Sequence, residues 1–144
     1  MPKKNNNALQ STHRRYLVWL EQAKWDVEAA KVSIENGFYE WATFQCQQSA
    51  EKSFKSLLVQ ASWKPPKMHN LGSLYNMCRK ANEDFRKIFL EYRDLEAFTF
   101  IARYPFLLPG ENASPHEFIT LEDAERCLAQ SQTIYAKIQR LLTD

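Results

Sequence analysis

The sequence contains little glycine, the residue that tight turns and phosphate-binding loops need most. Only three glycines occur among 144 residues. Folds rich in β-strands or loops use glycine at the turns where the chain adopts positive φ angles. A glycine-rich phosphate loop needs several glycines within a few residues. The shortage therefore argues against a β-rich fold and excludes a nucleotide site of the glycine-rich type.

Clusters of metal ligands are also missing. The three cysteines, Cys46, Cys78 and Cys127, are far apart, and none belongs to a CxxC pair. No two histidines stand at a spacing typical of a metal site. Each cysteine lies near the apolar stripe of an expected helix, so we expect buried, reduced thiols and, by default, a cytoplasmic location. We expect no metal and no cofactor.

Long apolar runs and an excess of one charge are absent as well. No apolar stretch approaches the ~20 residues of a membrane-spanning helix. The first ten residues, MPKKNNNALQ, lack the apolar core of a signal peptide. We expect residues 1–11 to form a disordered tail and residues 12–144 to form a single domain with a real core. A net charge of +2 and a pI of 8.4 neither demand nor exclude a nucleic-acid partner.

The sequence does contain long stretches that favour helix, and residues 38–63 are the clearest. This stretch has no glycine or proline and is bounded by Gly37 and by Pro65. One broad stripe of its helical wheel carries mostly small residues, which lets another helix approach closely: Ala42, Cys46, Ser49, Ala50, Ser53, Phe54, Leu57 and Ala61. The opposite side is mixed: Trp41, Phe44, Gln48, Glu51, Lys55 and Val59. We predict the central helix of a bundle.

Further helices are expected over residues 12–35, from about residue 71, over residues 84–102 and from residue 120. Asn70 and Thr120 are suitable N-caps for two of them. Residues 106–119 contain two proline-containing turns and are expected to form a loop. No strand pattern appears, so the sequence predicts an all-α, up-and-down helical bundle of about five helices. The first helix has a second apolar stripe, with Val18, Trp25 and Val32, which indicates an extra interface.

Candidate binding residues lie within the central helix, in the linker after it and at the end of the helix expected over residues 84–102. Lys52 and Lys55, with Arg103 and Tyr104, can form a basic and aromatic pocket for a phosphate or nucleotide. The alternatives are a solvated helix face for the lysines and a helix-terminal role for the arginine. His69 stands between a Pro-Pro linker and a helix start, where it either fixes the linker or binds a ligand. His13 and His116 are expected to be solvated or capping residues.

The order of these features resembles the HEPN domain family over about residues 16–142. The resemblance rests on a QxAEKxxK element at Gln48–Lys55, on His69 with Leu71, and on Arg103-Tyr104-Pro105. It extends to Ala23, Asp26 and Ala30, to Gly37-Phe38-Tyr39, and to the helix start at Thr120. Each element is weak alone, and the combination is fairly specific.

The resemblance implies a helical bundle that forms a homodimer, which would explain the second apolar stripe. It also implies a prokaryotic, toxin–antitoxin-like role beside a minimal nucleotidyltransferase, and binding of a nucleotide or RNA. Some members of the family are metal-independent ribonucleases with a histidine four to six residues after an arginine. This sequence departs from that spacing, because Arg103 precedes His116 by thirteen residues and no arginine precedes His69 at that distance.

Two hypotheses follow from the sequence. The first is a non-catalytic, dimeric binding module that uses Lys52, Lys55, His69, Arg103 and Tyr104. The second is a ribonuclease that uses Arg103 with His116 or His69, where histidine acts as a base on a 2′-hydroxyl and arginine stabilises the phosphorane charge. A histidine and an arginine that converge in one open cleft would favour the second hypothesis.

Overall fold

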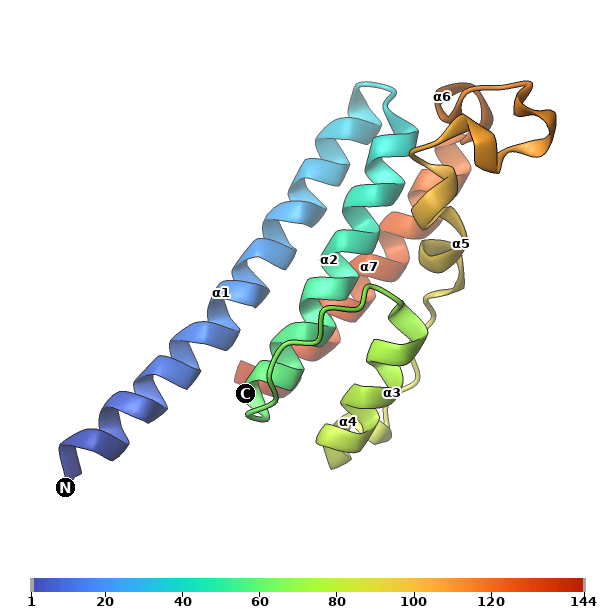
Figure 1. The fold of residues 1–144 in the computed structure, drawn as a ribbon. Coiled ribbons are helices and arrows are strands. Elements are labelled where there is room, and N and C mark those ends of the chain that lie inside the picture. Colours follow the sequence, from blue (N-terminus) through green and yellow to red (C-terminus); the bar gives the residue numbers. More distant parts are fainter. Residues whose placement is uncertain (1, 144) are drawn as a thin grey trace.

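Three long helices lie side by side and form the body of the molecule (Figure 1). The computed structural model describes residues 2–143, with side chains from residue 14 onward. The long helices are α1 (Pro2–Glu35), α2 (Tyr39–Gln60) and α7 (Leu121–Thr143). The chain ascends α1, descends α2 and, after the intervening segments, descends α7 (Figure 1). Within the described residues no strand occurs, and the all-α bundle predicted from the sequence is confirmed.

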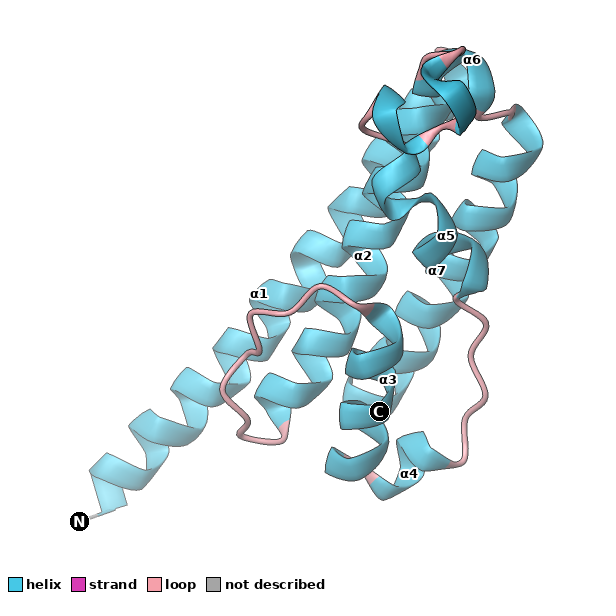
Figure 2. Cartoon of the chain, turned by 45° about the vertical axis from the view of Figure 1, so that its right-hand side comes forward, coloured by secondary structure: helices cyan, strands magenta, loops and turns pink. Residues whose placement is uncertain are grey.

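The shorter elements connect α2 to α7. The linker after α2 climbs back along the bundle to α3 (Leu71–Ala81), which descends to α4 (Glu83–Arg86) at the lower end. The chain then rises through α5 (Arg93–Ile101) to the upper end, as Figure 2 shows. There η1 (Pro105–Leu107), η2 (Pro109–Glu111) and α6 (Pro115–Phe118) precede α7. The predicted loop over residues 106–119 therefore contains short helical turns.

Helix α2 is the central element, as predicted. It packs against α1, α7, α3 and α5, and it also touches α6. Its small-residue stripe is buried, with Ala42, Cys46, Ala50 and Phe54 fully shielded from solvent. Ser49 and Ser56 donate hydrogen bonds to the α1 carbonyls of Ala23 and Tyr16, at 2.7 and 3.0 Å. Small side chains therefore bring the two helix backbones close enough for direct contact.

Several helix boundaries agree with the sequence. Gly37, at φ +81°, ends α1 in the left-handed conformation. Asn70 accepts a hydrogen bond from the Ser73 amide at 2.8 Å. Thr120 and Asp123 cap α7 reciprocally, each accepting from the other's amide. Helix α1 begins at Pro2 instead of near Thr12. The side chains of residues 1–13, including His13, lie outside the described ones. The tail predicted at the N-terminus therefore stays a prediction.

The single helix predicted over residues 84–102 is wrong. The chain forms α4 and α5, separated by an irregular connector over residues 87–92. The connector is fixed by tertiary contacts that local sequence does not reveal. The Tyr75 hydroxyl donates to the Ile88 carbonyl at 2.9 Å, and Leu90 enters the core. Phe89, although apolar and next to the buried Leu90, is 78% exposed.

The three cysteines are reduced and buried, as expected. Burial raises the pKa of the Cys46 thiol to about 12, because the thiolate would lose its hydration. The pKa values of Cys78 and Cys127 are raised for the same reason. These thiols fill space in the core and are not poised as nucleophiles. In the described part of the chain, no helix is both long and apolar enough to cross a bilayer.

Candidate functional site

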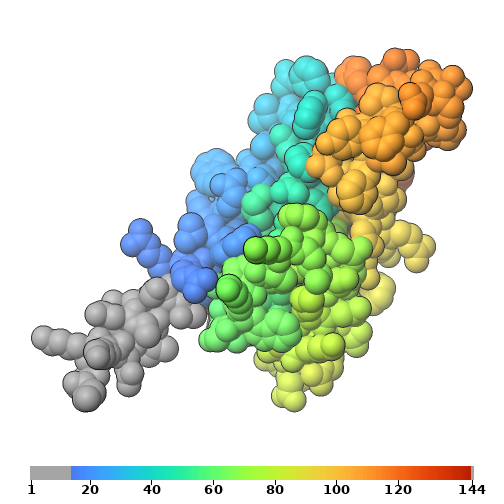
Figure 3. Space-filling view, in the orientation of Figure 1, coloured from blue at the N-terminus to red at the C-terminus, as the bar shows by residue number. Residues whose placement is uncertain are grey.

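One side of α2 carries a row of polar and aromatic side chains that meets the linker, α5 and α6. Apart from the adjacent Gln47 and Gln48, successive members are three or four residues apart, so they project from one side of the helix. We call this row the α2 stripe: Glu40, Phe44, Gln47, Gln48, Glu51 and Lys55. The linker and α3 flank the stripe below, residues 102–119 flank it above, and part of α2 stays visible beside α1 (Figure 3).

Glu51 is the centre of the lower part of the stripe. Its carboxylate accepts from Lys55 Nζ at 3.2 Å, from His69 Nδ1 at 3.0 Å and from Gln47 Nε2 at 3.5 Å. Glu51 is 5% exposed and Lys55 is 4% exposed. The two residues form an ion pair, and the solvated helix face weighed for Lys55 is wrong. Lys55 neutralises a buried carboxylate and supports the site from inside.

The buried carboxylate also orients His69. An ionised carboxylate only accepts hydrogen bonds, so the imidazole donates from Nδ1 and leaves Nε2 as an acceptor. The backbone carbonyl of His69 accepts from Gln47 Nε2 at 3.2 Å, which fixes the linker at a second point. The His69 side chain is nevertheless 73% exposed. Both roles weighed for His69 are therefore compatible: its inner nitrogen fixes the linker and its outer nitrogen faces solvent.

Lys52 extends this network to α1. Its ammonium lies 2.7 Å from Asp26 Oδ2 and 3.4 Å from Gln48 Oε1. Gln48 in turn donates to Gln47 Oε1 at 2.8 Å. A continuous chain of hydrogen bonds thus runs from Asp26 of α1, across α2, to His69 of the linker. Lys52 keeps 22% of its side chain exposed and so remains accessible to an anion.

Arg103 lies above this network and is surrounded by three aromatic side chains. Its guanidinium carbon lies 4.9 Å from the ring centre of Phe44 and 5.6 Å from those of Phe100 and Tyr104. Its Nε donates to the Thr99 carbonyl at 3.3 Å. These contacts hold a permanent positive charge against ring faces while Tyr104 stays 46% exposed. Arg103 thus has the helix-terminal role that was weighed for it, and it also contacts aromatic rings.

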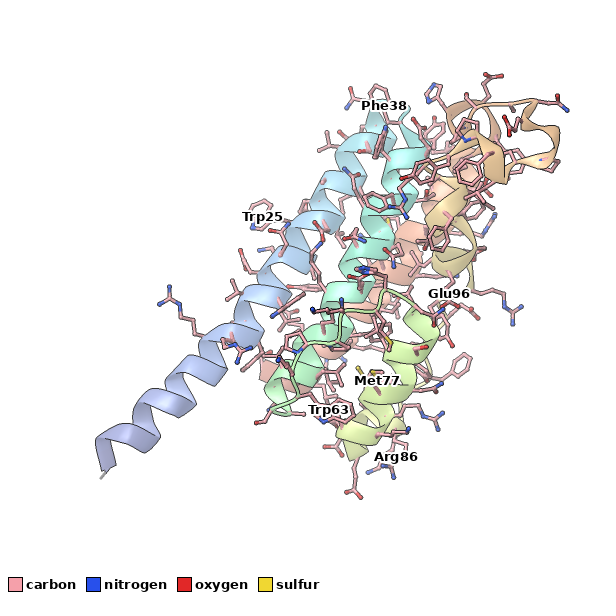
Figure 4. The ribbon with its side chains drawn as sticks, in the orientation of Figure 1. Trp25, Phe38, Trp63, Met77, Arg86 and Glu96 are labelled. Atoms are coloured by element: carbon pink, nitrogen blue, oxygen red, sulfur yellow. The ribbon has the colours of Figure 1, made fainter. Side chains whose placement is uncertain are left out.

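A cavity of about 270 Å³ lies between the linker and α5. It is lined by His69, Asn70, Glu96, Thr99 and Phe100. Glu96 lies beside the start of α3, where its carboxylate accepts from the Gly72 amide at 2.9 Å (Figure 4). Phe100 lines the cavity and also contacts the Arg103 guanidinium. Phe100 therefore belongs both to the lining of the cavity beside His69 and to the aromatic surroundings of Arg103.

His116, on α6, contacts a different part of the α2 stripe. Its Nδ1 lies 3.0 Å from both carboxylate oxygens of Glu40, and its ring lies 6.2 Å from that of Phe38. Glu40 and Glu51 are eleven residues apart, which corresponds to about 16 Å along the helix axis. His116 and His69 are thus held by separate carboxylates, with Arg103 between them at the level of Phe44.

Three partners in this site were not singled out from the sequence, Glu40, Gln47 and Glu96, and Asp26 was named only as part of the family resemblance, without a role. A usable signal was present for Glu40 and Gln47, because both continue the three-to-four spacing of Phe44 and Glu51. Asp26 and Glu96 act across helix interfaces, and their roles depend on how the helices pack. Within residues 14–143, no group of three His, Cys, Asp or Glu residues is arranged to hold a metal ion.

Known proteins are similar to this chain in sequence and in fold. The family model described as HEPN domain matches residues 16–141. The chain is 26% identical to a protein of Methanocaldococcus jannaschii named "Putative toxin MJ1304", over 133 residues and 88% of each chain.

Solved structures are similar as well. The crystal structure of TT1696 from Thermus thermophilus has a TM-score of 0.70 and 26% identity, covering 88% of this chain and 97% of that one. ST0689, described as an archaeal HEPN homologue, has a TM-score of 0.61 and 24% identity, covering 89% and 98% of the two chains. The second similarity concerns the fold alone.

Proposed function

The chain belongs to the HEPN domain family, and from this premise we propose that it is a non-catalytic, dimeric binding module that acts with a partner protein. Its ligand is a nucleotide or RNA, bound beside the α2 stripe. The partner that the family resemblance implies is a minimal nucleotidyltransferase, in a toxin–antitoxin-like pair. Lys52, His69, Arg103 and Tyr104 supply the contacts, and Lys55 holds Glu51 in place behind them.

The observation that carries the proposal is the position of Arg103, which lies among three aromatic rings, one of which also lines the cavity beside His69. A guanidinium fixed against aromatic rings offers a phosphate two parallel donors with little loss of side-chain freedom. The exposed ring of Tyr104 offers a face for a base. Lys52 and the outer nitrogen of His69 add further polar contacts on the same side of α2.

A non-catalytic role is favoured by the placement of the histidines. His116, the histidine that follows Arg103 in sequence, holds Glu40 with Nδ1 and packs against Phe38. His69 is held by Glu51 through Nδ1, whereas Arg103 lies against Phe44, Phe100 and Tyr104. Neither arrangement reproduces the spacing of four to six residues between arginine and histidine in the ribonuclease branch.

Ligand binding is expected to weaken by about 10- to 150-fold in Arg103→Ala, since a hydrogen bond to a charged group is worth about 1.5–3 kcal/mol. Calorimetric titration with ATP, GTP and a short RNA measures this. The matched control is Arg126→Ala, which removes an exposed arginine that pairs with Asp123 on α7. Affinity should also fall as salt rises. An absence of heat with every ligand would remove the site and leave only the protein-partner role.

The dimer is expected to form through the outer side of α1. Val18, Trp25 and Val32 are 57%, 55% and 57% exposed, and Trp25 points away from the bundle (Figure 4). Three large apolar side chains in one row favour burial against a second copy. Light scattering at micromolar concentration should report about twice the 16.9 kDa chain mass.

The double variant Trp25→Glu/Val32→Glu should shift the dimer to monomer, because it places like charges across the interface. Lys24→Glu, on the same helix, is the control for a change of charge alone. A wild-type mass near one chain at all concentrations would contradict the dimer.

A second candidate function is a ribonuclease toxin. Two observations favour it: the name of the M. jannaschii relative, and the carboxylate that orients His69. In this case His69 Nε2 would take the proton of a 2′-hydroxyl as its oxygen attacks phosphorus, the 5′-oxygen would leave with that proton, and Arg103 would stabilise the negative charge on the phosphorane oxygens. The two functions differ in whether the bound RNA is cleaved.

A further inference from the structure

A second basic and aromatic surface lies at the lower end of the bundle, remote from the α2 stripe. An open hollow of about 710 Å³ separates α4 and its connector from the last turns of α7. Helices α4 and α7 contact each other at this end. The lining residues are Asp84, Lys87, Ile88, Phe89, Lys137, Arg140 and Leu141. We call it the α4–α7 hollow.

The charge of the hollow is positive. Lys87, Lys137 and Arg140 outnumber Asp84, the one carboxylate among its described lining residues. Asp84 lies 3.7 Å from Lys87, and both side chains are largely exposed, so this pair is weak. Within residues 14–143, no carboxylate lies within ion-pair distance of Lys137 or Arg140. Cations in the last turns of a helix often only complement its dipole, so the charges alone do not define a site.

Phe89 supplies the independent observation. It is 78% exposed, the largest exposed fraction among the exposed large apolar side chains. The backbone on each side holds it outward. The Ile88 carbonyl is anchored by the Tyr75 hydroxyl, and Leu90 is only 2% exposed in the core. The chain therefore interrupts a helix and fixes an aromatic ring beside three cations, where water would favour a polar side chain.

The basic surface continues past α4. A neighbouring hollow of about 410 Å³ is lined by Asn76, Arg79, Lys80 and Arg86. Arg86 projects from the lower end of the molecule (Figure 4), and its Nε donates to the Arg79 carbonyl at 3.2 Å. Helix α4 thus has cations on both sides, which suits a ligand with more than one phosphate.

We propose that the α4–α7 hollow is a second ligand site, for a phosphorylated nucleoside. Phe89 stacks on the base, and Lys87, Lys137 and Arg140 contact the phosphate. A volume of several hundred Å³ suits a ligand of nucleotide size. An apolar ligand would leave three cations desolvated without partners, and a simple anion would leave Phe89 without a role. The same chemistry is present in a free nucleotide and in a unit of an RNA strand.

The test is calorimetric titration of ATP and of a twelve-residue single-stranded RNA at low salt. It uses the full chain carrying Arg103→Ala, so that binding at the α2 stripe is reduced. Phe89→Leu is expected to weaken the remaining binding by about 5- to 150-fold, because leucine is apolar but offers no ring to stack on. Phe89→Tyr is expected to retain it. Because Phe89 is exposed, neither variant should change the melting temperature by more than about 2 °C.

Charge variants separate the two ligand sources. Lys137→Ala/Arg140→Ala should weaken binding of both ligands by at least about tenfold and make it less sensitive to salt. Lys24→Ala/Arg93→Ala removes equal charge elsewhere and should have little effect. Arg86→Ala should weaken RNA alone if a strand crosses α4, and neither ligand if the site takes a free nucleotide. Equal affinity of Phe89→Leu and its Arg103→Ala parent for both ligands, or no residual binding by that parent, would overturn the proposal.

Discussion

Replacing Glu51 with alanine is expected to lower the free energy of unfolding by about 3–5 kcal/mol, the cost of breaking a buried ion pair from one side. Lys55 is 4% exposed and would keep a positive charge without its carboxylate. His69 would lose the acceptor of its Nδ1 proton, and Gln47 would lose a second partner. The linker before α3 would then be held at fewer points.

Urea denaturation followed by circular dichroism measures this loss, at one fixed protein concentration because the chain is expected to dimerise. Glu125→Ala, an exposed position on α7, is the matched control and should cost less than about 0.5 kcal/mol. The double variant Glu51→Leu/Lys55→Met should recover most of the loss, since it leaves no buried charge unpaired. A loss below about 1 kcal/mol for Glu51→Ala would mean that water reaches the carboxylate.

Replacing Phe54 with alanine is expected to cost about 3–5 kcal/mol, the usual range for removing a buried phenylalanine. Phe54 is fully buried, and its ring lies edge-on to Tyr75 at 6.1 Å and to Phe85 at 6.2 Å. The ring centres of Tyr75 and Phe85 are 5.5 Å apart. This aromatic cluster attaches α3 and α4 to α2, so its loss should loosen the lower end of the bundle.

The same denaturation experiment provides a matched control for this variant. Phe89→Ala removes an identical side chain from an exposed position and should change stability by less than about 0.5 kcal/mol. Similar losses for Phe54→Ala and Phe89→Ala would contradict the assignment of the two rings to core and surface.

The helices with strong local signals could be predicted from the sequence. Gly37 ends α1, Asn70 caps α3 and Thr120 caps α7, each through contacts within four residues. The apolar stripe of α2 was also readable, because small residues recur on one side of a helix without glycine or proline. The family resemblance, which rested on several spaced motifs, is confirmed.

The break between α4 and α5 could not be predicted from the sequence. No proline or glycine occurs in residues 87–92. The chain leaves the helix there because Tyr75, thirteen residues away, bonds to Ile88 and because Leu90 fills the core. Long-range packing overrides local helix preference in such a segment.

The candidate site was predicted in its members but not in its arrangement. Glu51 and Lys55 were placed on the mixed side of α2, and a solvated face was weighed for Lys55. The linker and α3 cover this side, and their path depends on the aromatic contacts between Phe54, Tyr75 and Phe85. Whether His69 and Arg103 meet was also open, because it depends on where α5 lies against α2.

The most direct test of the proposed function is a cleavage assay run on the same samples used for binding. Wild-type protein and the His69→Ala and Arg103→Ala variants are incubated with a labelled short RNA, in buffer with chelator, and analysed by gel electrophoresis over several hours. The proposed role as a non-catalytic binding module predicts an intact RNA in every lane, while the wild type binds that RNA in calorimetry and Arg103→Ala binds it more weakly. Cleavage by the wild type that is abolished in both variants would contradict it and establish a metal-independent ribonuclease that uses His69 and Arg103.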